Sequence, residues 1–177
     1  MKVFAICAKI ELTARPSWLN EFTAKYNPTW DPHVTLKQPC IITEGKISEL
    51  KEKISTFLAK NKFKDLSKKI IFNKTVFEKE SGIIMALAKE ADELIELQKN
   101  LRLAFSEYNN YKEEYRKEYE DNFQPHLTLV DRISPTTYTE SLKYFTDDFF
   151  CEGIIKHFVL IIVNELTKEK SEIIIEI

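Results

Sequence analysis

The sequence predicts a single α+β domain, residues 1–177, built from two similar lobes that share one cleft. Segments with the apolar period of strands and segments with the period of amphipathic helices alternate along the whole chain. No linker rich in Pro, Gly or Ser divides the 177 residues, a length that suits one domain with a real core. The pattern Pro-His-x-Thr-Leu occurs twice, at 32–36 and 125–129, which indicates a duplicated strand-helix-strand unit.

The first elements are predicted from the spacing of their apolar residues. The run 3–10 is apolar almost throughout and predicts a buried strand, whereas 16–26 spaces its aromatic and leucine side chains as a short helix does. Residues 33–42 are rich in β-branched and apolar residues and predict a strand, in which Pro39 indicates an edge or a bend. Residues 46–60 place five apolar side chains on one face of a helix.

The remaining elements continue the same alternation. Two apolar stretches, 68–78 and 82–89, flank the turn residues Glu80-Ser81-Gly82 and predict a β-hairpin. Leucines recur with helical spacing over 91–108, which predicts a long helix. The last predicted elements are a strand over 125–133, a helix over 135–145 and two strands over 154–166 and 170–177.

Charge and cysteine usage exclude several classes of protein. The net charge is −2, with 26 basic and 28 acidic residues, so we expect no binding of bulk DNA, although a local basic pocket for one or two phosphates remains open. The three cysteines are far apart and form no CxxC pair, so neither a disulfide framework nor a zinc site is indicated. The apolar run at 3–8 is shorter than a signal peptide or a membrane span requires. We therefore expect a monomer in the cytoplasm, away from membranes.

The repeated motif places a histidine and a threonine on the same face of a strand. Alternate residues of a strand share a face, so His33, Thr35 and Lys37 should point one way, and His126 and Thr128 should do so in the second copy. The aliphatic residues between them should point into the core. If the two lobes pair about a pseudo-twofold axis, the two polar faces confront each other across the cleft.

Such a pair of faces suits phosphodiester chemistry. One imidazole can take the proton of the attacking hydroxyl or water, and the other can protonate the leaving oxygen. The two threonine hydroxyls can hold the phosphoryl oxygens, with Lys37 as an electrostatic supplement. Trp30, just before the first motif, is a candidate for stacking a base, and a core position is equally open to it. There is no carboxylate cluster, HExxH motif or glycine-rich phosphate loop, so we expect neither metal nor cofactor.

Two further features have simpler explanations. The segment 107–123 repeats aromatic residues at intervals of three or four, among Lys112, Arg116 and Lys117. Such a stripe is typical of the half-buried face of a helix, and the alternative is a lid on which bases stack. The third histidine, His157, has no threonine two residues later and lies in an apolar strand pattern, which indicates a structural or surface role.

Two H-x-T motifs on strands, about half the chain apart, resemble the 2H phosphoesterase superfamily, whose members include 2′-5′ RNA ligase proteins and 2′,3′-cyclic nucleotide phosphodiesterases. Residues 30–37 resemble its first motif and residues 123–129 its second. The resemblance implies a bilobal fold in which two antiparallel sheets line a central cleft, with helices outside. It also implies that His33 and His126 are the catalytic pair and that the threonine of each motif binds the phosphate.

The resemblance implies a metal-independent phosphoesterase that acts on the 2′,3′-cyclic phosphate or 2′-5′ phosphodiester of a small nucleotide or RNA terminus. The chain departs from ligase-like members at Gln38-Pro39, where they continue with Phe-Leu-Gly, and at Arg132, which lies one residue later than their arginine. Two alternatives stay open: hydrolysis of cyclic or 2′-5′ oligonucleotide signals, and a nucleotide- or RNA-binding module with little turnover. The direction of reaction and the role of each histidine also stay open.

Overall fold

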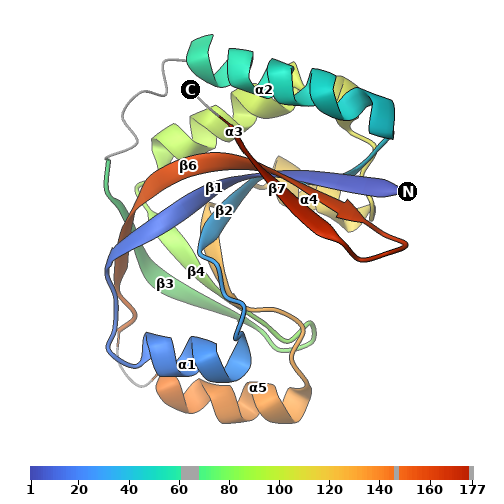
Figure 1. Ribbon diagram of the computed structural model, residues 1–177. Helices are drawn as coiled ribbons and strands as arrows, with labels where there is room; N and C mark the ends of the chain where they lie inside the picture. The colour runs from blue at the N-terminus through green and yellow to red at the C-terminus, as the bar shows by residue number, and fades with distance from the viewer. Residues whose placement is uncertain (61–67, 146–147, 176–177) are drawn as a thin grey trace.

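The computed structural model describes residues 1–60, 68–145 and 148–175, and it has the predicted α+β class (Figure 1). The strands are β1 (Lys2–Ala14), β2 (His33–Ile42), β3 (Ile70–Glu78), β4 (Ile83–Lys89), β5 (His126–Val130), β6 (Cys151–Asn164) and β7 (Lys170–Ile175). The α-helices of the described residues are α1 (Leu19–Tyr26), α2 (Ile47–Lys60), α3 (Asp92–Ala104), α4 (Tyr115–Asp121) and α5 (Pro135–Ser141). The last two residues of the strand predicted over 170–177 lie outside the described residues.

Helix α4 is the element that the predicted order lacked. It lies within the aromatic segment 107–123, and only Glu120 among its residues is buried. The predicted helix over 91–108 ends its α-helical part at Ala104 and continues as a 3-10 turn over Ser106–Tyr108. The other predicted strands and helices are present, with ends shifted by up to four residues where the hydrogen-bonded ladder or helix extends or stops.

All seven strands belong to one antiparallel sheet, whereas the sequence led us to expect two. The strand order is β2-β1-β6-β3-β4-β5, and β7 also pairs with β6. The physical reason is the length of β6. Its first residues, 151–153, pair with β3, its later residues, 158–163, pair with β7, and β1 runs along nearly all of it. One long strand therefore joins the two halves. The pseudo-twofold relation between two lobes stays a prediction.

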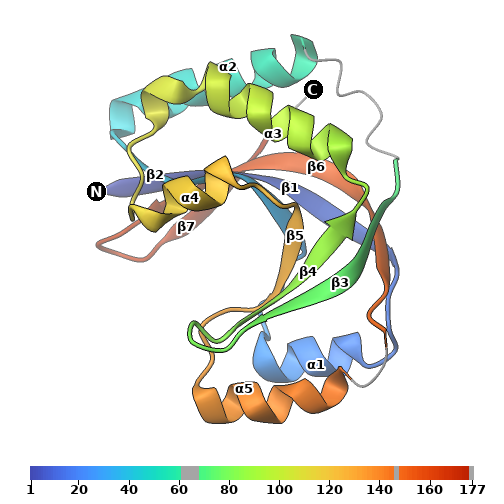
Figure 2. The same cartoon turned by 180° about the vertical axis from the view of Figure 1, so that it is seen from behind.

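The sheet bends so strongly that its two end strands, β2 and β5, approach each other (Figure 2). Side chains of the segment between α1 and β2 connect this segment to β5. The indole Nε1–H of Trp30 donates to the backbone oxygen of Thr128 at 2.9 Å, and the Asn27 amide donates to the backbone oxygen of Leu129 at 3.2 Å. The curvature thus brings the two strands that carry the repeated motif side by side.

Helices cover the sheet in two groups (Figures 1 and 2). Helices α2 and α3 lie together at one end and bury a leucine-rich stripe each. Helices α1 and α5 lie side by side at the other end, where Phe22 and Tyr138 are buried. One cluster of buried apolar side chains includes residues from both groups of helices and from all seven strands.

None of the helices in the described ranges combines the length and the apolar composition that crossing a membrane requires.

Candidate active site

The two copies of the motif have the same local structure. Each motif histidine is the first residue of its strand, β2 or β5. The carbonyl of Pro32 accepts a hydrogen bond from the N–H of Ile10 in β1, and that of Pro125 accepts one from the N–H of Ala88 in β4, each at 2.8 Å. Both strands then alternate half-buried and buried residues over their first four positions. A hydrogen bond from the neighbouring strand therefore fixes the backbone immediately before each histidine.

The two imidazole rings are oriented in the same way. The Nδ1 atom of His33 lies 2.7 Å from the backbone oxygen of Asp31, and that of His126 lies 2.8 Å from the backbone oxygen of Gln124. Because a carbonyl oxygen only accepts hydrogen bonds, Nδ1 carries the proton in both rings. In the neutral imidazole, Nε2 is then the nitrogen that can take a proton from a substrate.

Burial makes both histidines harder to protonate. Loss of solvent lowers the pKa of His33 and of His126 below the ordinary value of 6.5, and the backbone carbonyl that each ring contacts offsets part of this change. Lys9 and Lys170 lower the pKa of His33 further and the Asp31 carboxylate raises it, whereas Glu78 raises the pKa of His126. The charged surroundings of the two rings thus differ although their backbone settings match.

Both motifs open into one cavity of about 410 Å³, which we call the H-x-T cavity. Its lining includes His33 and Thr35 from β2 and His126 and Thr128 from β5. Trp30 also lines it, so the hydrogen bond from its indole to the backbone of Thr128 spans the two motifs at the cavity wall. Five of the six residues singled out from the sequence therefore lie around one space.

Three cations line the H-x-T cavity from three separate segments: Arg116 from α4, Arg132 from the turn after β5, and Lys170 from the start of β7. Arg116 also donates to the Gln38 side chain at 3.4 Å, and Lys170 pairs with Glu172 at 2.7 Å. Two carboxylates, Asp31 and Asp131, also line the cavity, so its cations outnumber its anions by one, and this excess of positive charge favours phosphate binding. The sequence pointed to the two arginines only in part, because Arg116 lies in the aromatic segment and Arg132 lies one residue after the arginine position of ligase-like members. No feature of the sequence pointed to Lys170.

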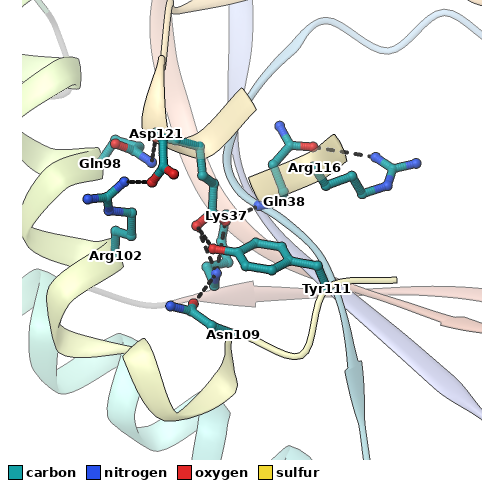
Figure 3. Close-up of polar contacts among 9 residues, drawn as sticks. Lys37, Gln38, Gln98, Arg102, Asn109, Tyr111, Arg116 and Asp121 are labelled. Carbon is teal, nitrogen blue, oxygen red and sulfur yellow. Dashed lines mark hydrogen bonds and ion pairs between the residues drawn. The ribbon is translucent and has the colours of Figure 1, made fainter. Parts of the chain in front are cut away.

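Lys37, the sixth residue, lies outside the H-x-T cavity. Its side chain is fully buried, and its ammonium contacts the two carboxylate oxygens of Glu120 at 2.9 and 3.0 Å and the Asn109 side-chain oxygen at 2.7 Å (Figure 3). The ammonium also lies 4.6 Å from the centre of the Tyr111 ring. Lys37 is therefore committed to a buried ion pair and is not placed to contact a phosphate beside Thr35.

A β-bulge explains why strict alternation misplaced this lysine. Cys7 of β1 pairs with Thr35, but the next residue back, Ile6, pairs with Lys37, so β2 contains one extra residue at this point. Such an insertion reverses which residues face each side of the sheet. Beyond the bulge, Gln38 lines the H-x-T cavity in the place that the alternation assigned to Lys37.

The aromatic segment divides between the cavity and the core. Tyr115 and Tyr119 of α4 line the H-x-T cavity, with ring centres 6.1 Å apart. Tyr108 is buried in the core, and Tyr111 donates its hydroxyl to Glu120 at 2.7 Å. The half-buried helix face that the sequence favoured is therefore wrong for α4, in which Tyr115 and Tyr119 are exposed, and Tyr108 and Tyr111 lie before this helix. The lid on which bases stack stays a prediction. His157 lines a different depression.

Within the described ranges, no three histidine, cysteine, aspartate or glutamate side chains gather closely enough to hold a metal ion.

Two H-x-T motifs on the end strands of a bent antiparallel sheet, lining one cavity, are the features of the 2H phosphoesterase superfamily. Comparison with known proteins identifies the family more closely. The model of the 2′-5′ RNA ligase superfamily matches residues 9–165, and the chain therefore belongs to this superfamily. A separate comparison with curated proteins found no match.

Proposed function

We propose that this protein is a metal-independent phosphoesterase that acts on the 2′,3′-cyclic phosphate or 2′-5′ phosphodiester of a nucleotide or RNA end. The observation that carries the proposal is the convergence of His33, Thr35, His126 and Thr128 on one cavity. Membership of the 2′-5′ RNA ligase superfamily supports phosphoester chemistry. The three cations of the cavity outnumber its two carboxylates and would help to hold an anionic substrate.

In this proposal the two histidines divide the proton transfers. One imidazole, neutral at the start, takes the proton from the attacking hydroxyl as the new P–O bond forms. The other, protonated at the start, gives its proton to the departing oxygen as the old P–O bond breaks. The two roles exchange in the reverse direction. Because Nδ1 of each ring is held by a backbone carbonyl, Nε2 is the atom that exchanges protons.

The threonines would donate hydrogen bonds to the non-bridging phosphoryl oxygens. A thiol beneath the site supports this role for Thr35, because Cys7 Sγ donates toward Thr35 Oγ1 at 3.8 Å. Burial raises the pKa of Cys7 to about 12, so it stays a protonated thiol at neutral pH. The thiol is the donor in this contact, so the proton of the Thr35 hydroxyl remains available for a hydrogen bond to the substrate.

The test is turnover of 2′,3′-cyclic nucleotides and 2′-5′-linked dinucleotides in the presence of a metal chelator. We expect His33→Ala and His126→Ala each to lower kcat/KM by about 10²–10⁴-fold, the usual contribution of a general acid or base. His157→Ala is the matched control and should retain full activity, because His157 does not line the H-x-T cavity. Thermal unfolding of each variant checks that it is folded.

Three outcomes would contradict the proposal. Undiminished turnover by either motif variant would remove that histidine from the chemistry. A requirement for added zinc or manganese would contradict a metal-independent reaction. Tight binding of these nucleotides without turnover would favour a binding module.

A further inference from the structure

Lys9 of β1 carries its charge in a place with little access to water. Its side chain is 7% exposed, and the residue lies directly opposite His33 in the ladder between β1 and β2. The ammonium pairs with the Asp31 carboxylate and, at 3.0 Å, with the carboxylate of Glu172 in β7. A buried ammonium is costly without such partners, so these two ion pairs fix where the Lys9 charge lies.

Asp31 connects the Lys9 ammonium to the His33 imidazole. The Asp31 carboxylate pairs with Lys9, and the Asp31 backbone oxygen accepts the hydrogen bond from Nδ1 of His33 at 2.7 Å. Ile10, the residue after Lys9, donates its N–H to the Pro32 carbonyl at 2.8 Å. Strand β1 therefore contacts the segment before His33 in two ways, through a charged side chain and through a backbone hydrogen bond.

The second motif lacks the ion pair, although its backbone contact with the neighbouring strand is the same. His126 lies opposite Leu87 of β4, which takes the place that Lys9 has in the first motif. Its Nδ1 contacts the backbone oxygen of Gln124, which takes the place of Asp31. The uncharged copy orients its imidazole just as well, so what the ion pairs add at the first motif is charge.

A second lysine connects these ion pairs back to the H-x-T cavity. Four charges alternate in sign along the pairs, in the order Lys170, Glu172, Lys9 and Asp31, and we call these residues the charge series. Its two end members line the H-x-T cavity, whereas Lys9 and Glu172 line the separate depression that also contains His157. Lys9 is therefore placed to act on the first motif histidine from outside the space that a substrate would fill.

We propose that the charge series controls the proton affinity of His33 and so distinguishes this histidine from His126, with Lys9 as the positioning residue that carries the control. The inference rests on the function proposed above, because it concerns the two members of the acid–base pair. The Lys9 ammonium opposes a second positive charge on the neighbouring imidazole. It also holds two carboxylates that would otherwise be free to favour that charge.

Other ionisable groups face His33 as well. Within the charge series, Lys9 and Lys170 lower the His33 pKa and Asp31 raises it. The H-x-T cavity adds groups from α4, from β5 and from the turn after β5, namely Tyr115, Arg116, Tyr119, His126, Asp131 and Arg132. His157 of β6 lies beyond Lys9 in the sheet. These other groups stay the same in the variants below, so a change at His33 reports on the charge series.

Titration of the imidazoles followed by NMR tests the proposal without requiring turnover. The chain has three histidines, so each signal can be assigned with the variant that lacks it. Lys9→Leu installs the residue type that faces His126, removes a positive charge and releases two carboxylates. The titration midpoint of His33 should therefore move to higher pH, by about half a pH unit or more. The midpoint of His126 should stay in place, because Glu78 is the charge that shifts its pKa.

Asp31→Asn should have the opposite effect. It keeps the backbone carbonyl that contacts His33 and removes a negative charge, so the His33 midpoint should move to lower pH. Glu172→Gln should lower the midpoint in the same way. If both Lys9→Leu and Asp31→Asn move the midpoint to higher pH, the variants have exposed the imidazole, and the proposal is refuted. Should Lys9→Leu fail to fold, an unchanged midpoint in Asp31→Asn and in Glu172→Gln would overturn it.

Lys2→Leu is the matched control. It makes the same substitution at the start of the same strand, where Lys2 pairs with Glu44 at 2.6 Å and lines neither the H-x-T cavity nor the depression beside Lys9. The His33 midpoint of this variant should equal that of the natural protein. A shift as large as that of Lys9→Leu would show a general effect of charge and would refute the specific role of Lys9.

The pH profile of kcat/KM for a 2′,3′-cyclic nucleotide connects the titrations to the reaction. Whichever proton transfer His33 performs, the limb that it controls should follow its midpoint to higher pH in Lys9→Leu. If the natural protein turns over the nucleotide but Lys9→Leu leaves the midpoint and both limbs in place, the inference is wrong and the proposed function stands. If the natural protein turns over none of the proposed substrates, the proposed function fails, and the titrations still decide whether the charge series controls His33.

Discussion

Replacing Lys37 by methionine tests what holds helix α4 beside the H-x-T cavity. Lys37 in β2 and Glu120 in α4 form an ion pair in which both side chains are almost completely buried (Figure 3). The Glu120 carboxylate also accepts from the Gln38 backbone N–H and from the Tyr111 hydroxyl, each at 2.7 Å. Four donated hydrogen bonds therefore converge on one carboxylate, and they connect the first motif strand to the helix.

The size of the effect follows from the burial. Removing one partner of a buried ion pair leaves an unpaired charge away from water, which costs about 3–5 kcal/mol. In a protein of this size that loss corresponds to a fall in Tm of about 6–20 °C. Replacing both partners, as in Lys37→Met/Glu120→Leu, removes the unpaired charge. We expect the double variant to recover most of the stability, short by about 1–3 kcal/mol because the other two donors lose their acceptor.

Thermal and urea unfolding of the single and double variants, followed by circular dichroism, measures these differences. Lys68→Met is the control, because its ammonium pairs with Glu93 at the exposed surface, and its loss should change stability by less than about 1 kcal/mol. Since α4 carries Arg116 and Tyr119 to the cavity, folded Lys37→Met should also show a raised KM. If Lys37→Met unfolds like the natural protein and the double variant gains nothing over it, the ion pair does not anchor the helix.

Three other expectations concern the turn, the strand contact and pH. Gly82 has a φ of +67°, and a Cβ at this position would lie 2.1 Å from the backbone oxygen of Ile133. In a urea titration, Gly82→Ala should therefore lower the free energy of unfolding by about 2 kcal/mol or more. Gly45 has open space around it, so Gly45→Ala should leave the free energy of unfolding nearly unchanged in the same titration. Trp30→Phe removes the indole donor to the Thr128 backbone and should cost about 0.5–1.5 kcal/mol of stability and lower kcat/KM. Burial lowers the pKa of both motif histidines. The histidine that acts as the base therefore stays neutral, and active, down to a lower pH. The histidine that acts as the acid loses its proton, and its activity, at a lower pH than an exposed histidine would. The maximum of kcat/KM should therefore lie on the acidic side of pH 6.5, and a maximum in alkaline buffer would contradict this assignment.

The strand that carries the first motif shows how far the sequence leads. Its predicted bounds, 33–42, are those of β2, because β-branched and apolar residues make up most of this strand. Alternation also placed His33 and Thr35 on one face. This holds because the ladder with β1 is regular there, with His33 opposite Lys9 and Thr35 opposite Cys7. Where the pairing of two strands is regular, the alternation of residues along one strand is therefore enough to predict which side chains share a face.

The same strand shows where local rules stop. The bulge that turns Lys37 away is a property of the pairing between two strands, and nothing in the residues of either strand alone fixes its position. Pro39 gave a partial signal, since it lies in the next irregular stretch, where Phe4 pairs with Cys40. Its carbonyl accepts a hydrogen bond from the N–H of Lys112, in the segment that leads to α4. The proline thus lies in the second irregular stretch of β2, where this strand contacts that segment.

The cations of the cavity depend on still longer-range structure. Arg116, Arg132 and Lys170 come from a helix, a turn and an edge strand, and no sequence period relates them. They meet because the long β6 carries β7, because the sheet bends β5 toward β2, and because a buried ion pair docks α4. Each of these conditions requires contacts between segments far apart in the chain, which a single sequence does not reveal.

These long-range neighbours also make the two copies of the motif unequal. Lys9 and Lys170 oppose the charged form of His33 while the Asp31 carboxylate favours it, and Glu78 favours the charged form of His126. The repeated motif therefore supplies two imidazoles with matching backbone contacts, and residues outside the repeat give the two rings different charged surroundings.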